Sequence, residues 1–108
     1  MLLREHDRES LLQIFASVDG NFEVWAYGSR VNGSAHDGSD LELVIRNENL
    51  IKMPFKTMAL LRQRITNSNI PILVQLNDWT ALPEYFHEEI LKNYEVLLPF
   101  KSSAPADC

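Results

Sequence analysis

The sequence has only one cysteine and no long hydrophobic run, and each absence excludes a class of protein. Cys108 is the final residue, so no disulfide forms within the chain and no cysteine-based metal site is expected. The longest uncharged apolar run, residues 70–76, is far shorter than the ~20 residues of a membrane-spanning helix. Charges begin at Arg4 and leave no apolar core for a signal peptide. We therefore expect a cytoplasmic protein with no membrane partner.

Basic residues are also in the minority. Ten Lys and Arg stand against fifteen Asp and Glu, which gives a net charge of -5 over 108 residues. This balance disfavours broad binding to the phosphate backbone of nucleic acids. Hydrophobic residues make up 45% and charged residues 23%, as in folded globular domains and unlike disordered or coiled-coil chains. At this length the chain forms one small domain, so any enzyme here is a minimal one.

Apolar spacing and chain-breaking residues predict seven elements in the order α-β-β-α-β-α-β. Helices are expected from residue 10 to Gly20, from Pro54 to about residue 66, and from Pro83 to about residue 93. Strands are expected over residues 22–28, 40–46, 71–76 and 94–98. This order predicts an α/β (α+β) fold with a mixed sheet of about four strands packed against helices. We expect one domain over residues 1–100 and a flexible tail over residues 101–108.

The segment YGSRVNGSAHDGSDLEL, residues 27–43, carries the most chemical information. Gly28 and Ser29 follow a predicted strand, where glycine lets the backbone approach a ligand closely. If a short helix begins at Ser29, its N–H groups and the Ser29 hydroxyl would hold phosphate oxygens, and Arg30 could add charge-assisted bonds. A glycine- and serine-rich surface turn is the alternative interpretation.

Asp40 and Glu42 are two residues apart on a predicted strand, so both carboxylates point to one face of the sheet. Hard divalent cations prefer such oxygen ligands, and Mg²⁺ usually combines one or two carboxylates with substrate phosphates. A phosphate-binding turn beside an acidic pair suggests phosphoryl or nucleotidyl transfer. Trp25, Tyr27 and Trp79 are expected in the core rather than stacked on a base.

The chain resembles the minimal nucleotidyltransferases of the DNA polymerase beta superfamily. The resemblance rests on Gly28-Ser29, ten intervening residues, Asp40-x-Glu42, a later apolar strand and the pair Asp78-Trp79, and it covers residues 22–98. It implies a nucleotidyltransferase fold in which Gly28 and Ser29 hold the phosphates of ATP or another NTP, with Arg30 beside them. It also implies that Asp40 and Glu42 ligate two Mg²⁺ ions while an acceptor hydroxyl displaces pyrophosphate from the α-phosphorus.

The resemblance further implies a partner. Small members of this family are commonly the antitoxins of bacterial modules whose other member is a HEPN-domain protein, and some adenylylate a tyrosine of that protein. An AMP-transferring antitoxin is therefore the leading interpretation. Association of the chain with itself stays open.

One position departs from the family pattern. The third carboxylate of the family is expected on the strand of residues 71–76, where this sequence has Gln75. A neutral amide supplies no charge and accepts no proton, so we expect the cation that activates the acceptor to be held poorly. Asp78 is the nearest substitute, but strand alternation places it on the opposite face from Gln75.

Two other interpretations therefore stay open. The first is a weakened or inactive nucleotidyltransferase fold that neutralises a HEPN-type partner by occlusion, which Gln75 favours. The second is an accessory nucleotide-binding subunit of a larger transferase. The stretch from Lys52 to Arg64 contains basic and no acidic residues, and it is either a docking face or an ordinary solvated helix.

Overall fold

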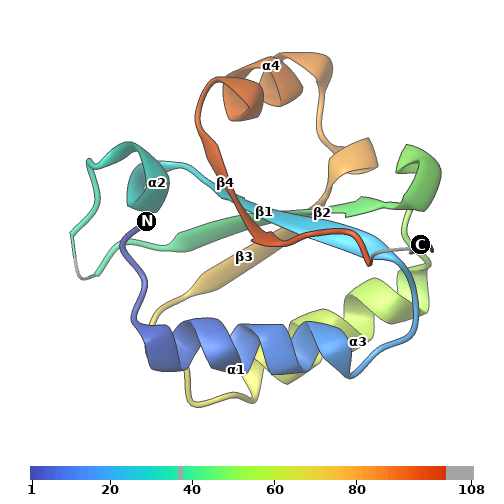
Figure 1. Ribbon diagram of the computed structural model, residues 1–108, viewed down its shortest axis with the longest axis horizontal. Helices are drawn as coiled ribbons and strands as arrows, with labels where there is room; N and C mark the ends of the chain where they lie inside the picture. The colour runs from blue at the N-terminus through green and yellow to red at the C-terminus, as the bar shows by residue number, and fades with distance from the viewer. Residues whose placement is uncertain (37, 102–108) are drawn as a thin grey trace, which may run out of the picture.

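The computed structural model describes residues 1–36 and 38–101, and four strands within them form one mixed sheet (Figure 1). The strands are β1 (Phe22–Tyr27), β2 (Leu41–Asn47), β3 (Val74–Asp78) and β4 (Tyr94–Leu98), arranged in the order β3-β2-β1-β4. β1 is antiparallel to both β2 and β4, and β2 is parallel to β3. The predicted mixed sheet of about four strands is thus confirmed. β1 and β2 are its central strands.

The helices cover both faces of this sheet. They are α1 (Glu5–Ala16), α2 (Ser29–Asn32), α3 (Phe55–Thr66) and α4 (Glu84–Lys92), with two 3₁₀ turns, η1 (Glu48–Leu50) and η2 (Trp79–Ala81). Figure 1 shows α1 and α3 together on one face and α4 on the other. The short helix α2 lies at the end of β1, where the sequence places the glycine-serine pair.

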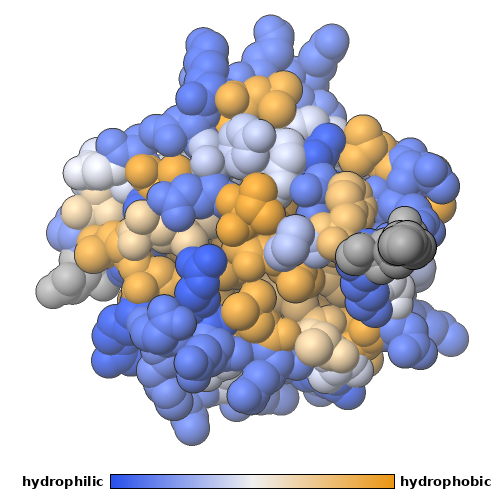
Figure 2. All heavy atoms as spheres, in the orientation of Figure 1, coloured by the Kyte–Doolittle hydropathy of each residue, from blue (hydrophilic) through white to orange (hydrophobic). Residues whose placement is uncertain are grey.

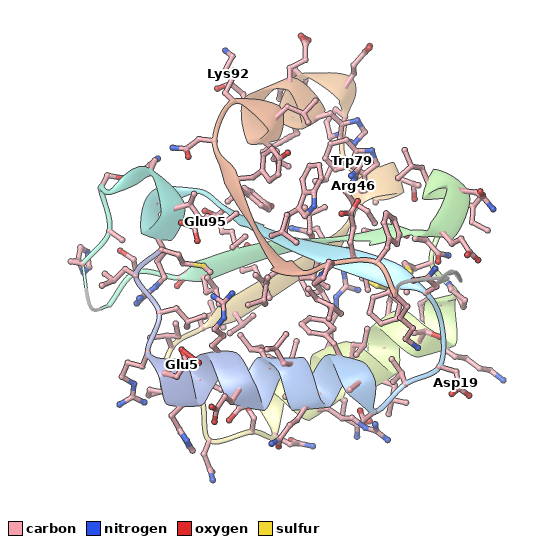
Figure 3. The ribbon with its side chains drawn as sticks, in the orientation of Figure 1. Glu5, Asp19, Arg46, Trp79, Lys92 and Glu95 are labelled. Atoms are coloured by element: carbon pink, nitrogen blue, oxygen red, sulfur yellow. The ribbon has the colours of Figure 1, made fainter. Side chains whose placement is uncertain are left out.

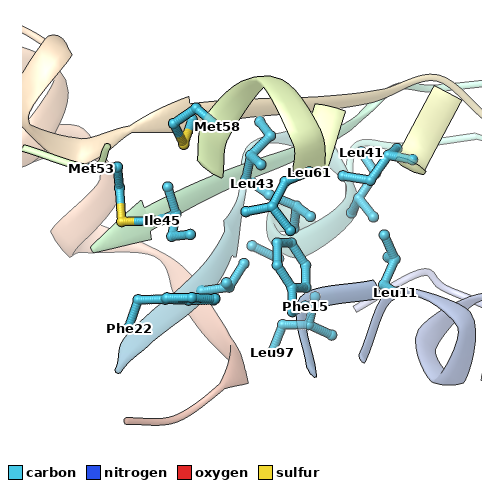
Figure 4. Close-up of a cluster of buried hydrophobic side chains, with 14 residues drawn as sticks. Leu11, Phe15, Phe22, Leu41, Leu43, Ile45, Met53, Met58, Leu61 and Leu97 are labelled. Carbon is cyan, nitrogen blue, oxygen red and sulfur yellow. The ribbon is translucent and has the colours of Figure 1, made fainter. Parts of the chain in front are cut away.

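The face covered by α1 and α3 is an aliphatic core (Figure 4). Alternate residues of β2 point into it, since side chains along a strand alternate between the two faces. The helices contribute residues three or four apart, as an amphipathic helix does. The fully buried members include Leu11, Phe15, Val24, Leu41, Leu43, Ile45 and Leu61. This packing fixes β2 and therefore the two carboxylates at its start.

The opposite face is aromatic. Trp25 and Trp79 pack edge to face with ring centroids 5.6 Å apart. The Arg46 guanidinium lies 4.0 Å from the Trp25 ring and 4.5 Å from the Trp79 ring, beside Trp79 in Figure 3. Arg46 also forms an ion pair with Glu23. These contacts hold η2 against the sheet. Trp25, Tyr27 and Trp79 are all buried in the cluster on this face, which confirms that they are core residues.

Two predicted elements differ from the structure. The first helix begins at Glu5 rather than residue 10, because Asp7 is buried against the Arg4 guanidinium, 3.0 Å away, and so extends the packed face. The third strand begins at Val74 rather than Pro71, and it is an edge strand rather than a buried one. Leu73 before it is 63% exposed. Phe55, the first residue of α3, is 83% exposed, whereas Met58, Leu61 and Ile65 of the same helix are buried.

The predicted flexible tail lies outside the described residues except for Lys101. The backbone N–H of Lys101 donates to the Asn21 side-chain oxygen at 2.7 Å. In the part of the chain that the structure describes, no helix is both long and apolar enough to cross a membrane.

Candidate functional site

The turn at Gly28 brings the glycine-serine pair against the acidic strand. Gly28 has φ 82° and ψ -156°, a conformation that only glycine adopts readily. The N–H groups of Val31 and Asn32 both donate to its carbonyl oxygen at 3.0 Å and start α2. A Cβ at this position would lie 2.1 Å from the Glu42 carboxylate oxygen Oε2. Glycine is therefore required both for the backbone angle and for the place of the Glu42 side chain. Ser29 opens α2 and is half-buried.

The two predicted acidic residues lie together at the start of β2. Glu42 is half-buried between Leu41 and Leu43, whose side chains enter the aliphatic core. Asp40 directly precedes β2. Burial raises the pKa of the Glu42 carboxyl above its ordinary value, and the negative charge of Asp40 raises it further. The two carboxylates therefore repel each other, and a cation between them would relieve that repulsion.

Gln75 lies beside Glu42 on the third strand, β3. In the sheet register Glu42 pairs with Tyr27 on one side and with Gln75 on the other. The Gln75 side chain is exposed, and its Nε2 donates to Asp40 Oδ2 at 2.9 Å. The structure thus brings Gly28, Asp40, Glu42 and Gln75 together.

Asp78 does not take the place of the missing carboxylate. It pairs with Ile45 at the far end of the β2–β3 ladder, and its side chain is buried. Its carboxylate accepts from the backbone N–H of Met53 at 2.8 Å and of Thr80 at 3.1 Å. Asp78 therefore holds the turns before α3 and after β3.

Arg30 is engaged with backbone carbonyl oxygens. Its guanidinium donates to the carbonyl oxygens of Leu2 at 2.6 Å and Ser39 at 2.9 Å, and the side chain is buried. These bonds tie α2 to the N-terminal segment and to the residue just before Asp40. Contact with phosphate stays a prediction for Arg30. The observed contacts give it a second role, which is to position the loop that ends at Asp40.

A pocket that the sequence did not predict lies beside Gly28 and Glu42. It has a volume of about 330 Å³ and lies between α2 and α4, with Gly28, Asn32 and Glu42 on one side and Phe86, Ile90 and Asn93 on the other. This volume is at the lower end of the range for ligand pockets, about 300–1,000 Å³. Burial raises the pKa of the Tyr27 hydroxyl at the pocket, which keeps it neutral. Lys92 points away from the sheet in Figure 3 and pairs with Glu89 at 2.8 Å.

The donor set fits a hard divalent cation. Asp40 and Glu42 offer carboxylate oxygens, the ligands that Mg²⁺ prefers, and burial together with the Asp40 charge raises the pKa of Glu42. Among residues 1–36 and 38–101, however, no three His, Cys, Asp or Glu side chains are grouped so as to hold a metal ion. Asp40 and Glu42 are thus the two residues of this site that would hold such an ion.

This arrangement of a glycine turn, an acidic strand and a mixed sheet agrees with a comparison of the sequence with known families. The family described as "Polymerase beta, Nucleotidyltransferase" matches residues 9–101, most of the chain. The chain therefore belongs to the polymerase beta nucleotidyltransferase family.

Individual relatives are consistent with this family. The chain is 39% identical over 77 residues to the probable protein adenylyltransferase MntA of Haemophilus influenzae, a match that covers 71% of this chain and 66% of that protein. Its fold is similar to that of a toxin-antitoxin crystallised with AMP-PNP, with a TM-score of 0.69, 14% identity, and coverage of 86% of this chain and 73% of the other. A mutant of the toxin-antitoxin MntA-HpeT gives a TM-score of 0.66 at 18% identity, with coverage of 90% and 74%. The two structures support the fold.

Proposed function

We propose that this nucleotidyltransferase transfers AMP from ATP to a hydroxyl group with the help of Mg²⁺. The observation that carries the proposal is the close approach of the Gly28 turn to the Glu42 carboxylate, which occupies the space that a Cβ at position 28 would take. It joins a phosphate-binding turn and a cation-binding strand in one site. The choice of AMP follows the name of the Haemophilus relative, a probable protein adenylyltransferase.

The glycine-serine pair and the two carboxylates divide the work of this reaction. Gly28 and Ser29 hold the terminal phosphates, and Asp40 and Glu42 hold the cation. When bound, Mg²⁺ supplies positive charge to the phosphate oxygens and to the leaving group. The acceptor oxygen forms a bond to the α-phosphorus, and the bond from that phosphorus to the bridging oxygen breaks. Pyrophosphate leaves with the bond electrons, and the hydroxyl proton passes to water because the Gln75 amide has no basic site.

The pocket between α2 and α4 is the place for the nucleoside. A triphosphate held at Gly28 and Ser29 has its sugar and base at the adjacent wall, where Phe86 offers an aromatic face and Asn32 and Asn93 offer amide groups. Aromatic faces and amide donors are the groups with which proteins recognise bases outside a duplex.

The acceptor that we propose is a hydroxyl on a HEPN-type partner protein. Support comes from the two similar structures, which are those of toxin-antitoxins. The surface offers a second argument, because Figure 2 shows apolar atoms gathered in the middle of one face, over β4. Val96 in this edge strand is 42% exposed and Phe100 just after it is 38% exposed. Contiguous apolar surface of this kind is typical of a protein interface.

The basic stretch around α3 is a weaker candidate for docking. Arg62 donates to the Leu76 carbonyl oxygen at 2.8 Å, and Arg64 donates to the Ser17 carbonyl oxygen at 3.2 Å. Two of the four basic side chains in this stretch therefore have structural contacts. The other two, Lys52 and Lys56, are exposed.

Gln75 favours a second candidate, a binding protein that has kept the fold and neutralises its partner without transfer. One experiment separates the two. The chain is incubated with Mg²⁺, a lysate of its source cells and ATP labelled at the α-phosphate, in parallel with the Asp40→Asn variant. Transfer predicts a labelled protein band that the variant fails to produce. A band of equal strength with Asp40→Asn would refute the site, and the absence of a band with all four NTPs would favour the binding protein.

A further inference from the structure

Gln75 and Asp40 form a hydrogen bond with each other between the third strand and the residue before β2. Gln75 Nε2 donates to Asp40 Oδ2 at 2.9 Å, and the register pairs Gln75 with Glu42. The amide thus touches one carboxylate and neighbours the other. An amide N–H is a donor, whereas a carboxylate in the same place would be a third acceptor and a third negative charge. The residue therefore changes what the site can hold.

The charges of the site limit the number of cations. Two carboxylates give a formal charge of -2, which balances one divalent ion. Two divalent ions about 3.5–4 Å apart, as in two-metal sites, need further anionic ligands between and around them. Within the described residues no third carboxylate, histidine or cysteine joins Asp40 and Glu42. Asp78 is occupied by two backbone N–H groups at the other end of β3.

The Gln75 amide also forms a direct hydrogen bond with the Asp40 carboxylate. One of the two Asp40 oxygens accepts the amide hydrogen bond, which supplies part of the stabilisation that a second cation would provide. For a cation to bind that oxygen on the Gln75 side, the hydrogen bond must break and the amide must turn its oxygen inward. A neutral oxygen then attracts the cation less strongly than a carboxylate does.

We propose that this site binds one divalent cation, and that the neutral side chain of Gln75 sets this number. The inference rests on the proposed function in one respect, which is that the cation is the one used in AMP transfer. The ion is held by Asp40 and Glu42, on the side of β2 that faces the Gly28 turn. The side that faces β3 holds none.

The test counts bound Mn²⁺ by the electron paramagnetic resonance signal of the free ion. Native chain and Gln75→Glu are titrated with Mn²⁺ alone and then with Mn²⁺ and saturating AMP-PNP. Glutamate has the shape of glutamine, so this change adds a charge and removes the N–H donor with no change in volume. Gln63→Glu, on an exposed position of α3, adds the same charge elsewhere and is the matched control.

We expect one ion in the native chain and in Gln63→Glu, and two ions in Gln75→Glu with the nucleotide analogue. With Mn²⁺ alone, Gln75→Glu should bind on the order of tenfold more tightly than the native chain, since each added ligand charge strengthens the attraction. The melting temperature of Gln75→Glu should also rise more with Mn²⁺ than that of the other two chains.

Two results would overturn the inference. Two ions in the native chain would show that a neutral side chain at position 75 suffices for the second site. Equal counts and equal Mn²⁺ affinities in the native chain and Gln75→Glu would show that Gln75 does not set the number. Failure of the proposed function gives a different result, because the chain then fails to bind AMP-PNP or transfers label without Asp40. The titration with Mn²⁺ alone still decides this inference in that case.

Discussion

Gly28 and Gln75 lie on opposite sides of Glu42, and the two sides of this carboxylate are built differently. Gly28 follows the buried central strand β1, has a positive φ, and presses against the Glu42 side chain. Gln75 is in the edge strand β3, is exposed, and is held by one hydrogen bond. A change at Gly28 therefore disturbs the fold, whereas a change at Gln75 alters charge with little effect on packing. The side of Glu42 toward Gly28 is constrained by folding, and the side toward Gln75 tolerates a change of side chain.

The largest effect should follow Gly28→Ala. The new Cβ would meet Glu42 Oε2 at 2.1 Å and would strain a backbone with φ 82°. We expect a stability loss of about 1–3 kcal/mol and loss of ATP binding, measured by urea unfolding and calorimetric titration. Gly33→Ala is the control, because Gly33 has φ 90° but nothing lies within 4 Å of the added Cβ. If the two variants bind ATP equally well, the contact with Glu42 has no functional importance.

The next largest effect should follow Arg30→Met. The change keeps the aliphatic stem but removes charged donors to the Leu2 and Ser39 carbonyl oxygens. These partly buried carbonyl oxygens then lose their partner, which costs about 1–2 kcal/mol of unfolding free energy in a urea titration. Lys56→Met, which removes a positive charge from an exposed position of α3, should stay within about 0.5 kcal/mol of the native chain. Equal losses in both variants would contradict a positioning role for Arg30.

A smaller effect is expected for Phe86→Ala in the pocket. Stacking of a base on an aromatic side chain is worth about 1–3 kcal/mol, and Phe86 is 38% exposed, so we expect ATP to bind about fivefold more weakly. Calorimetric titration with ATP measures this change. Phe55→Ala removes an exposed ring on α3 and should leave the affinity unchanged. An unchanged affinity in Phe86→Ala would place the nucleoside elsewhere.

The smallest effect concerns the pH dependence of stability. Burial and the Asp40 charge raise the pKa of Glu42 in the folded chain above its ordinary value of 4.5. The folded state then binds more protons than the unfolded state, so the contribution of Glu42 is full below pH 4.5 and is lost as the pH rises through the raised pKa. Without divalent ions, Glu42→Gln should therefore gain in melting temperature relative to the native chain as the pH rises from 4 to 7. A constant difference over that range would contradict the shift.

Much of the fold could be predicted from local pattern. The alternation in residues 40–46 and the glycine after β1 correctly indicated two strands, because burial on one or both faces leaves a clear hydrophobic signal. Their central place in the sheet was not predicted. The start of β3 could not be predicted, since Ile72 and Leu73 are as apolar as a strand interior but lie outside the ladder. The burial of Asp7, which extends α1, depends on an ion pair that spacing alone does not reveal.

The candidate site was predicted in its members but not in its contacts. Spacing brought together Gly28, Asp40 and Glu42, and the family pattern located Gln75 beside them. The carbonyl contacts of Arg30 depend on the path of the loop before Asp40 and on the N-terminal segment, neither of which has a periodic signal. The α2–α4 pocket depends on how α4 packs over the sheet, which joins residues far apart in the chain. The structural role of Arg30 had one signal in the sequence. It is a single arginine next to the glycine-serine pair and ahead of a loop whose carbonyl oxygens need a donor.

The contrast between the two sides of Glu42 is tested most directly by Gln75→Asp in a single-turnover assay. Native chain, Gln75→Asp and Gln75→Asn are each saturated with α-labelled ATP and Mg²⁺ and given the acceptor identified by labelling. The restored carboxylate should raise the transfer rate on the order of tenfold or more and leave ATP affinity within about twofold, whereas Gln75→Asn should match the native chain. An unchanged rate in Gln75→Asp, or a rate gain explained entirely by tighter ATP binding, would contradict a site that is intact toward the nucleotide and depleted toward the acceptor.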